Sequence, residues 1–424
     1  MDLNNLTSFI DVDNKCDFPI QNLPYGIFRK KSDENYRVCT VIGTYILDLK
    51  VLSDSGYFVN TKVKDIDCFS QSSLNKLMSL GKETRIEVRQ RLLEILSSDN
   101  PELKDNAQLR EKAFSPLKGA DLKLPVDIGD YTDFYSSKEH ATNVGIMFRG
   151  KENALMPNWL HLPAGYHGRA SSIILSGENI HRPMGQTKAD DEENPTFGPS
   201  RLLDFELEMG FFIGTGNKLG HPIPINEAED HIFGMVIVND WSARDIQKWE
   251  YVPLGPFNAK NFATSISPWV VTMEALEPFR TKSPDHEKEP LEYLKDSRNC
   301  SYDIKLEVLL QAEDMTEPMR ICESNFKYLY WSMCQQLAHH TITGCNMQTG
   351  DLLASGTISG SDKTSFGSML ELTWRGSEPI KLSNGQERKF IQDGDTVIMR
   401  AFCENSSFRI GFGQVITKIL PAVK

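Results

Sequence analysis

The sequence lacks an excess of positive charge. Its 424 residues include 46 Lys and Arg against 58 Asp and Glu, which gives a formal net charge of −12. Proteins that bind nucleic acids through phosphate contacts need clustered basic residues, and here the basic residues are scattered among a larger number of acids. We therefore expect neither a nucleic acid nor a membrane surface as a partner.

Long apolar runs are also missing. No stretch approaches the roughly 18 consecutive apolar residues that a membrane-spanning helix requires. Hydrophobic residues make up 40% of the chain and charged residues 25%, a composition typical of folded soluble proteins. Residues 1–15 contain neither the basic nor the apolar segment of a secretory signal. We expect a soluble cytoplasmic protein.

The eight cysteines contain no Cys-x-x-Cys pair, and the two that are closest in sequence, Cys334 and Cys345, are 11 positions apart. This spacing argues against a zinc knuckle and against a redox motif. We therefore expect reduced, mostly buried thiols.

Several well-known catalytic motifs are absent as well. The chain has no Gly-x-Ser-x-Gly sequence and no phosphate-binding Gly-x-x-x-x-Gly-Lys-Ser/Thr loop, which argues against an α/β-hydrolase and a P-loop enzyme. Residues 214–220 resemble a dinucleotide fingerprint, but the last glycine falls one residue late, so a β-turn is the better interpretation. His339 and His340 end an expected helix at 328–340 without the neighbours that a zinc site needs.

The length predicts more than one domain, because single cores usually stop growing at about 250–300 residues. We place the boundary near residue 118, in a linker at 114–121, which gives domains of 1–118 and 119–424. The first contains two expected strands within 36–49, with a break at Gly43, and two expected helices within 73–98, with a break at Gly81. The second is dominated by β-type runs at 201–213, 231–239, 302–311 and 396–403.

A first group of acids follows a strict alternation at 203–209. On a single strand, Asp204, Glu206 and Glu208 would share one face, opposite Phe205 and its apolar neighbours. From the pattern alone, a solvated outer face is the simpler interpretation. The alternative is a bound Ca²⁺ or Mg²⁺, which would turn the repulsion between carboxylates into attraction.

A second group lies just beyond the expected strand at 232–238. Asn239 and Asp240 are suited to cap a helix over 241–251. On that helix Asp240, Arg244, Gln247 and Tyr251 would share one face. This face is either solvated or the wall of a ligand site, and the pattern leaves both possibilities open.

A third group contains a possible general base. Asp133, Tyr135 and His140 lie within eight residues, and Arg149 follows. Histidine is the usual general base near neutral pH. Glu371, which we expect on a strand, could orient such a base, or it could be an ordinary exposed glutamate.

Taken together, five segments strongly resemble the fumarylacetoacetase family, in order and over nearly the whole chain. They are residues 130–137 with His140, 158–169, 202–209, 239–247 and 356–360. The resemblance implies a fold that is mainly β with some α. It consists of a small N-terminal β-barrel of the Src-homology type and a large mixed β-sandwich roll, in a homodimer.

The resemblance also implies a reaction. It is the hydrolysis of a carbon–carbon bond in fumarylacetoacetate to fumarate and acetoacetate, the last step of tyrosine and phenylalanine degradation. Ca²⁺ and Mg²⁺ are the expected cofactors, and the diketo-acid substrate is the expected small-molecule partner. The implied cation ligands are Asp133, Glu206, Glu208 and Asp240, with a second cation beside Lys260 and Thr264 that shares Asp240.

The remaining roles follow from the same resemblance. His140 is the implied general base, paired with Glu371. The implied donors to the developing oxyanion are Arg244, Gln247 and Lys260. The implied substrate contacts are Tyr135, Arg149, Tyr166, Gln247, Tyr251 and Thr357.

One departure concerns the second cation. The family usually reads Gly-Lys-Ser-Phe-Gly-Thr there, whereas this chain has Ala259 and Ala263 in place of the two glycines, which could alter the approach of the backbone.

Two other functions remain open. One is a related enzyme acting on acylpyruvates or decarboxylating a β-keto acid, and the other is a non-catalytic scaffold. The presence of His140, Glu371 and all four carboxylates argues against the scaffold.

Overall fold

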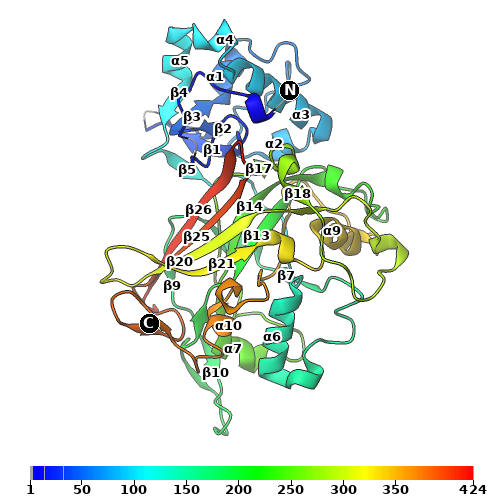
Figure 1. Cartoon of the computed structure of the whole chain (residues 1–424), viewed down its shortest axis with the longest axis vertical. Coiled ribbons are helices and arrows are strands. Elements are labelled where there is room, and N and C mark those ends of the chain that lie inside the picture. Colours follow the sequence, from blue (N-terminus) through cyan, green and yellow to red (C-terminus); the bar gives the residue numbers. More distant parts are fainter. Residues whose placement is uncertain (1–2, 14, 32, 424) are drawn as a thin grey trace.

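The computed structural model describes residues 3–13, 15–31 and 33–423. The fold is mainly β with some helices, as predicted. The N-terminal part lies at one end of the molecule, and the long strands of the remaining chain extend away from it (Figure 1).

The N-terminal part contains a five-stranded sheet in the order β4-β3-β2-β1-β5. Its strands are β1 (Tyr25–Arg29), β2 (Arg37–Ile42), β3 (Tyr45–Asp48), β4 (Phe114–Pro116) and β5 (Asp121–Lys123). The predicted break between strands is confirmed, because Gly43 turns the chain with φ of +57° and β2 pairs antiparallel with β3. The sheet continues past residue 118 to β5, and the domain boundary near that position stays a prediction.

Helices fill the chain between β3 and β4. They are α1 (Leu49–Asp54), α2 (Asn75–Met78), α3 (Gly81–Leu96), α4 (Pro101–Lys104) and α5 (Ala107–Ala113). The break predicted at Gly81 is confirmed, since α3 begins there. Asp48 fixes the start of α1 by accepting the backbone N–H groups of Lys50 and Val51 at 3.1 and 3.3 Å, which satisfies two donors that a helix start leaves free.

An eight-stranded sheet forms the centre of the rest of the molecule, in the order β7-β6-β22-β13-β14-β16-β8, with β17 paired to β14. Its strands are β6 (Tyr131–Phe134), β7 (Gly165–Gly168), β8 (Ile173–Leu175), β13 (Leu207–Ile213), β14 (Ile232–Asp240), β16 (Thr264–Ile266), β17 (Val271–Thr272) and β22 (Leu352–Ala354).

A second sheet has five strands in the order β21-β20-β25-β26-β9. They are β9 (Ile180–His181), β20 (Lys305–Gln311), β21 (Met319–Asn325), β25 (Thr396–Glu404) and β26 (Arg409–Leu420). Short pairs complete the β structure: β10 (Met184–Thr187) with β11 (Thr196–Pro199), β12 (Leu203–Asp204) with β15 (Ser242–Ala243), β18 (Arg280–Thr281) with β19 (Ser301–Tyr302), and β23 (Ile380–Lys381) with β24 (Glu387–Arg388).

Five α-helices flank these sheets: α6 (Lys138–Arg149), α7 (Arg244–Glu250), α8 (Met273–Leu276), α9 (Met333–Thr341) and α10 (Met369–Leu372). The helix predicted at 328–340 is α9, which begins later because Ser332 caps it and exchanges hydrogen bonds with Gln335. The segment 187–200 includes β11 of the β10–β11 hairpin, which projects at the bottom of Figure 1.

The eight-stranded sheet is buried on both faces. Along β14, Met235 and Ile237 point into the core shared with the second five-stranded sheet, which contains β20, β25 and β26. The intervening Val236 and Val238 point into a core shared with the N-terminal part. Because side chains alternate along a strand, one strand serves both cores and joins the two parts of the chain.

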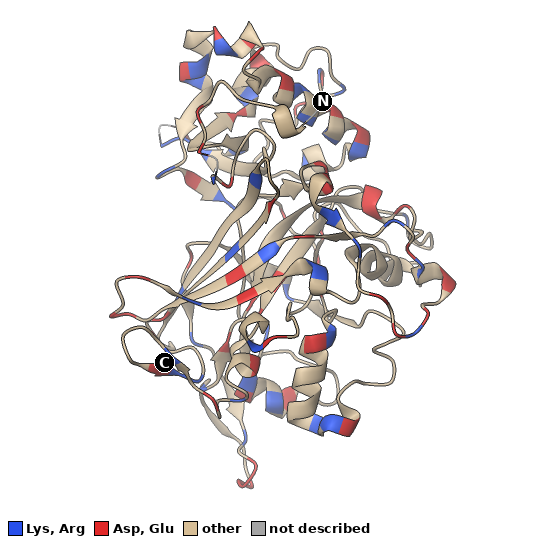
Figure 2. Cartoon of the chain, viewed as in Figure 1, with Lys and Arg blue, Asp and Glu red and all other residues tan. Residues whose placement is uncertain are grey.

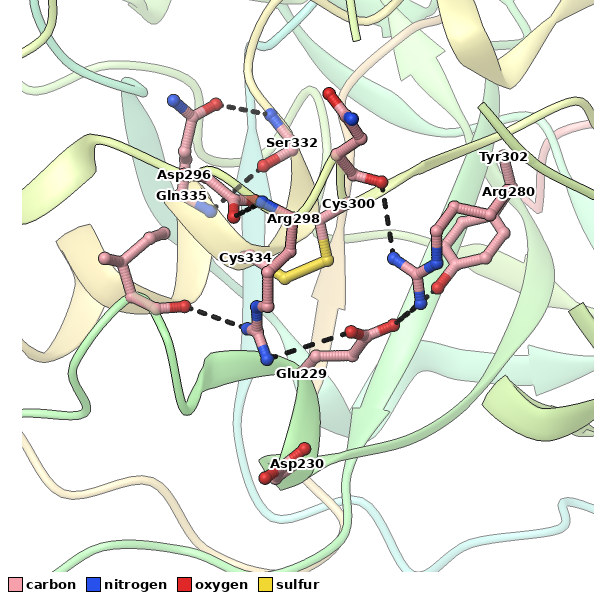
Figure 3. Close-up of a disulfide and its surroundings, with 12 residues drawn as sticks. Glu229, Asp230, Arg280, Asp296, Arg298, Cys300, Tyr302, Ser332, Cys334 and Gln335 are labelled. Atoms are coloured by element: carbon pink, nitrogen blue, oxygen red, sulfur yellow. Dashed lines mark hydrogen bonds and ion pairs between the residues drawn. A yellow bond between two sulfur atoms is a disulfide. The ribbon is translucent and has the colours of Figure 1, made fainter. Parts of the chain in front are cut away.

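The prediction of reduced cysteines is wrong for one pair. Cys300 and Cys334 form a disulfide (Figure 3), and both residues are fully buried. The bond joins the residue before β19 to the first turn of α9, 34 positions along the chain. The sequence spacing gave no sign of this pair, because the fold alone brings the two elements together. The other six cysteines are free, and four of them are buried.

Basic and acidic residues are interspersed over both parts of the molecule (Figure 2). Within the described ranges, no helix is long and apolar enough to cross a membrane.

Candidate active site

Four buried carboxylates meet near the ends of the central strands. Asp133 lies on β6, Glu208 on β13 and Asp240 at the end of β14, while Glu206 lies between β12 and β13. One oxygen from each lies within 4.8 Å of the others. The sequence pattern had placed these acids in three separate groups, and the pairing of β13 with β14 and the shared sheet with β6 bring them together.

This geometry corrects two predictions. Asp204, Glu206 and Glu208 are all buried, so a solvated outer face at 203–209 is wrong, and the expected single strand is interrupted between β12 and β13. Asp240 belongs to strand β14 rather than to a helix cap, because α7 begins only at Arg244. The face expected on a helix over 241–251 therefore comes from a strand end and a shorter helix.

Two cations of the protein contact the acidic cluster. Lys260 Nζ donates to Glu206 and to Asp240, and Arg244 Nη1 lies 2.8 Å from Glu206 Oε1. Burial acts to raise the pKa of Glu206, but the charges of Lys260 and Arg244 outweigh it and hold that pKa below its ordinary value. Glu206 is therefore the carboxylate of the cluster that the protein itself neutralises.

Two other carboxylates of the cluster lack such compensation. Asp133 Oδ1 and Glu208 Oε1 are buried and find no hydrogen-bond partner among the residues that the structure describes. Burial, followed by the charges of the neighbouring acids, raises the pKa of both groups well above their ordinary values. Free, buried, converging oxygens of this kind fit a hard divalent cation, which prefers oxygen ligands. These residues could therefore hold a metal.

The candidate general base lies beside this cluster. His140, on α6, is buried, and its Nδ1 lies 2.7 Å from Glu371 Oε2. Glu371 also accepts hydrogen bonds from Asn143 at 3.0 Å, Ser359 at 3.0 Å and Ser368 at 2.8 Å. Burial acts to raise the pKa of Glu371, but His140 and these donors lower it below its ordinary value.

Glu371 lies on helix α10 and not on the strand that we predicted, and it is fully buried. Ser368 caps this helix by accepting the N–H of Glu371 at 3.3 Å. The sequence did contain this signal, because Ser followed three residues later by Glu is the pattern of a capping box.

A cavity of about 310 Å³ joins the acidic cluster to His140. Every predicted substrate contact lines it: Tyr135, Arg149, Tyr166, Gln247, Tyr251 and Thr357. Its other lining residues include Lys248, Phe148 and Pro256. Tyr166 donates to Asp240 Oδ2 at 3.2 Å, and the ring of Tyr135 packs edge-on against His140. Arg149 and Tyr251 are exposed, so they belong to the open side of the cavity.

Asp204 is a residue of the site to which the family resemblance assigned no role. It is fully buried, accepts Arg244 Nε at 2.9 Å, and accepts the backbone N–H groups of Met369 and Leu370 at 2.7 and 3.0 Å. Asp204 therefore joins the guanidinium of Arg244 to the start of α10, which carries Glu371. Its place in the alternation at 203–209 was visible in the sequence, but its partners were not.

The two alanines that depart from the family pattern are accommodated. The side chain of Ala259 packs with Ala243 and Ile246, and Ala263 belongs to the large core. Thr264 Oγ1 donates to Asp240 Oδ1 at 3.0 Å. Both methyl groups therefore point into apolar packing.

Comparisons with known proteins agree with this arrangement. The model of the fumarylacetoacetase N-terminal domain matches residues 21–125, and that of the fumarylacetoacetate hydrolase C-terminal domain matches residues 131–420. The chain is 56% identical to a fumarylacetoacetase of Dictyostelium discoideum over 423 residues, which cover 99% of each chain. It is 56% identical to a fumarylacetoacetase of Homo sapiens over 418 residues, which cover 98% of this chain and 99% of the other.

Solved structures share the fold at much lower identity. A fumarylacetoacetate hydrolase of Exiguobacterium antarcticum is 16% identical with a TM-score of 0.51, and the match covers 94% of this chain and 99% of the other. Since two family models and full-length relatives agree, the chain belongs to the fumarylacetoacetase family.

Proposed function

We infer that this protein is a hydrolase that cleaves a carbon–carbon bond of fumarylacetoacetate to give fumarate and acetoacetate, the last step of tyrosine and phenylalanine degradation. One observation carries this conclusion. His140, paired with the buried Glu371, lines one cavity together with Asp133 and Glu206 of the four converging carboxylates, in a chain whose full-length relatives are fumarylacetoacetases.

The reaction requires a nucleophile at one carbonyl carbon and a place for the electrons of the broken bond. A 1,3-diketone provides that place as an enolate. A divalent cation held by Asp133, Glu206, Glu208 and Asp240 would supply Lewis-acid stabilisation of the enolate oxygen when bound.

We propose His140 as the general base. Its Nδ1 faces Glu371, which leaves Nε2 as the nitrogen that takes a proton from water. Glu371 holds the imidazole in this tautomer and stabilises the imidazolium that forms, as the carboxylate does in a Ser-His-Asp triad. The hydroxide then attacks the carbonyl carbon, the carbon–carbon bond breaks as the tetrahedral adduct collapses to fumarate, and the acetoacetate leaves as an enolate that takes up the proton held by the imidazolium. No covalent enzyme intermediate is needed.

We propose Arg244, Gln247 and Lys260 as donors to the tetrahedral oxyanion. Arg244 Nη2 is buried and unpaired within the described part of the chain, so it is available to a ligand, while Nη1 donates to Gln247 Oε1 at 3.2 Å. Such donors act most strongly in the transition state, and each is worth about 3–4 kcal/mol.

The remaining cavity residues supply substrate contacts in this proposal. Thr357 would contact the substrate from a buried position, Tyr135 and Tyr166 from half-buried positions, and Arg149 and Tyr251 from the open side. The substrate is a dianion and the protein is acidic. The guanidinium groups of Arg149 and Arg244, together with Lys260 and the proposed cations, would nevertheless make the cavity locally positive, which matters more for binding than net charge does.

We propose Ca²⁺ at the four-carboxylate site and Mg²⁺ at a second site beside Lys260 and Thr264 that shares Asp240. Oxygen ligands suit both ions. The pKa of Lys260 is raised by the charges of Asp240 and Glu206, which outweigh the opposing effect of burial. Its Nζ therefore stays protonated and offsets negative charge rather than acting as a ligand.

The larger organisation is also a proposal. We propose a Src-homology-type barrel for residues 1–118, a β-sandwich roll for 119–424, a homodimer, and a cytoplasmic location. The five-stranded N-terminal sheet and the two sheets of the remaining chain are compatible with the first two points.

The test is the ultraviolet absorbance of fumarylacetoacetate incubated with the purified protein in buffer containing Ca²⁺ and Mg²⁺. We expect loss of the diketone absorbance, with fumarate and acetoacetate as products. A constant absorbance with folded protein would refute the proposal. Acylpyruvates and a β-keto acid, assayed in parallel, test the related enzymes, and inertness toward all substrates would favour a scaffold.

A further inference from the structure

One carboxylate outside the cavity lining connects two elements of the proposed oxyanion site. Glu250 is the last residue of α7, the helix that carries Arg244 and Gln247. Its carboxylate accepts three consecutive backbone N–H groups, from Phe257 at 2.8 Å, Asn258 at 3.1 Å and Ala259 at 2.8 Å. The next residue in the chain is Lys260.

The segment that Glu250 holds has little apolar packing of its own. Val252, Leu254 and Phe257 are 67%, 96% and 67% exposed. An exposed segment of this kind gains little from hydrophobic burial, so hydrogen bonds must fix its path. Glu250 provides three of them at the point where the chain turns back toward the cavity.

The position of Glu250 is also unfavourable for helix stability alone. A negative charge at the C-terminal end of a helix is repelled by the helix dipole. Three N–H donors offset this cost, because hydrogen bonds to a charged acceptor are stronger than those between neutral groups. The arrangement thus favours a fixed backbone before Lys260 over the stability of α7.

The side chain of Lys260 connects the segment held by Glu250 to the acidic cluster. The backbone N–H of Lys260 donates to Phe257 at 3.1 Å, and Lys260 Nζ contacts Glu206 and Asp240. Ala259 in turn accepts the N–H of Ala243, at the start of α7, at 2.9 Å. The position of Nζ therefore depends on the segment that Glu250 holds.

We propose that Glu250 is a positioning residue that acts through Lys260, placing its ammonium group for the oxyanion; this role rests on the function proposed above. Glu250→Gln keeps the shape of the side chain but turns one acceptor into an NH₂ group that faces an N–H. We expect kcat to fall roughly 10- to 100-fold, as for a catalytic group displaced by about 1 Å, with little change in KM. Glu193→Gln, on the exposed turn between β10 and β11, is the matched control and should leave kcat unchanged.

A double-variant cycle separates positioning from general stabilisation. In a Lys260→Met background, Glu250→Gln should cause little further loss of kcat, because the group through which it acts is gone. An equal loss in both backgrounds would overturn the proposal, as would an unchanged kcat in the single variant. If Glu250→Gln fails to fold, Glu250→Asp, which keeps the charge on a shorter side chain, enters the same cycle.

Hydrogen exchange tests the same idea without any substrate. The amides of residues 257–259 should exchange faster in Glu250→Gln than in the unmodified protein, and unchanged exchange would overturn the proposal. This measurement does not depend on turnover. Failure of the protein to hydrolyse fumarylacetoacetate would therefore refute the proposed function. Hydrogen exchange of the amides of residues 257–259 would still show whether Glu250 holds this segment.

Discussion

Glu371 and Glu208 belong to the same site and are equally buried, yet their surroundings are opposite. Glu371 receives hydrogen bonds from Asn143, Ser359 and Ser368 and faces His140, and its pKa is lowered. Glu208 receives one N–H from Gly356. Its other oxygen lacks a partner in the described part of the chain, and its pKa is raised.

This difference shows what the protein supplies and what it leaves to a cofactor. A buried carboxylate without partners costs free energy unless it is protonated or bound to a cation. The neighbourhood of Glu371 is complete and holds His140 in one orientation. A bound cation would complete the neighbourhood of Glu208 and Asp133.

The largest expected effect comes from removing His140, the partner of Glu371. His140→Ala should lower turnover by about 10²- to 10⁴-fold, the usual contribution of a general base. Metal analysis should find the same cation content as in the unmodified protein, because His140 is not among the proposed ligands. His221→Ala, at an exposed position, is the control. Near-normal turnover in His140→Ala would remove this residue from the mechanism.

Replacing Asp133, one of the carboxylates that lack partners, should affect cation binding and stability. Asp133→Ala should lose the cation, as measured by calorimetric titration with Ca²⁺. At a Ca²⁺ concentration 100 times the dissociation constant, binding stabilises a folded protein by about 2.7 kcal/mol. Added Ca²⁺ should therefore raise the melting temperature of the unmodified protein and not that of the variant. An unchanged Ca²⁺ stoichiometry in Asp133→Ala would show that the ligand set is wrong.

The lowered pKa of Glu371 predicts a pH effect on unfolding. Its folded-state pKa lies below the unfolded value near 4.5. Its contribution is therefore present above pH 4.5 and is lost as the pH falls through the folded-state pKa. Glu371→Gln should flatten the decrease in unfolding free energy in this acidic range, as followed by denaturant titrations at several pH values. The same slope in both proteins would contradict the lowered pKa.

The smallest effect on the site should come from the disulfide, which lies outside the cavity lining. Denatured protein prepared without reductant should show six reactive thiols, and eight after reduction. Cys334→Ser should leave turnover nearly unchanged, because neither cysteine of this pair lines the cavity. Eight thiols before reduction would contradict the disulfide.

Some features of the fold could be read from local sequence patterns. The turn at Gly43, the break at Gly81 and the strand that begins at Ile232 follow from glycine placement and periodicity, which are properties of a few neighbouring residues. The acids of the site were also visible, and their joint role came from the family resemblance.

Other features depend on tertiary contacts that no local pattern contains. The alternation at 203–209 has the same form whether its acidic face meets water or a cluster of further acids, so the burial of Glu208 could not be inferred. Asp240 resembled a helix cap from its place in the sequence, but strand β14 continues to this residue. The pairing of Cys300 with Cys334 depends on how α9 packs, and the carboxylate of Glu250 finds its donors only after the chain turns back.

The most direct test of this account is to restore a cation to chelated protein. The protein is stripped of divalent cations, and turnover of fumarylacetoacetate is measured as Ca²⁺ and Mg²⁺ are added back, together with the bound metal content. We predict that turnover is lost on chelation and returns as the four-carboxylate site fills. Full turnover in protein that retains less than about one tenth of an equivalent of any divalent cation would contradict the account.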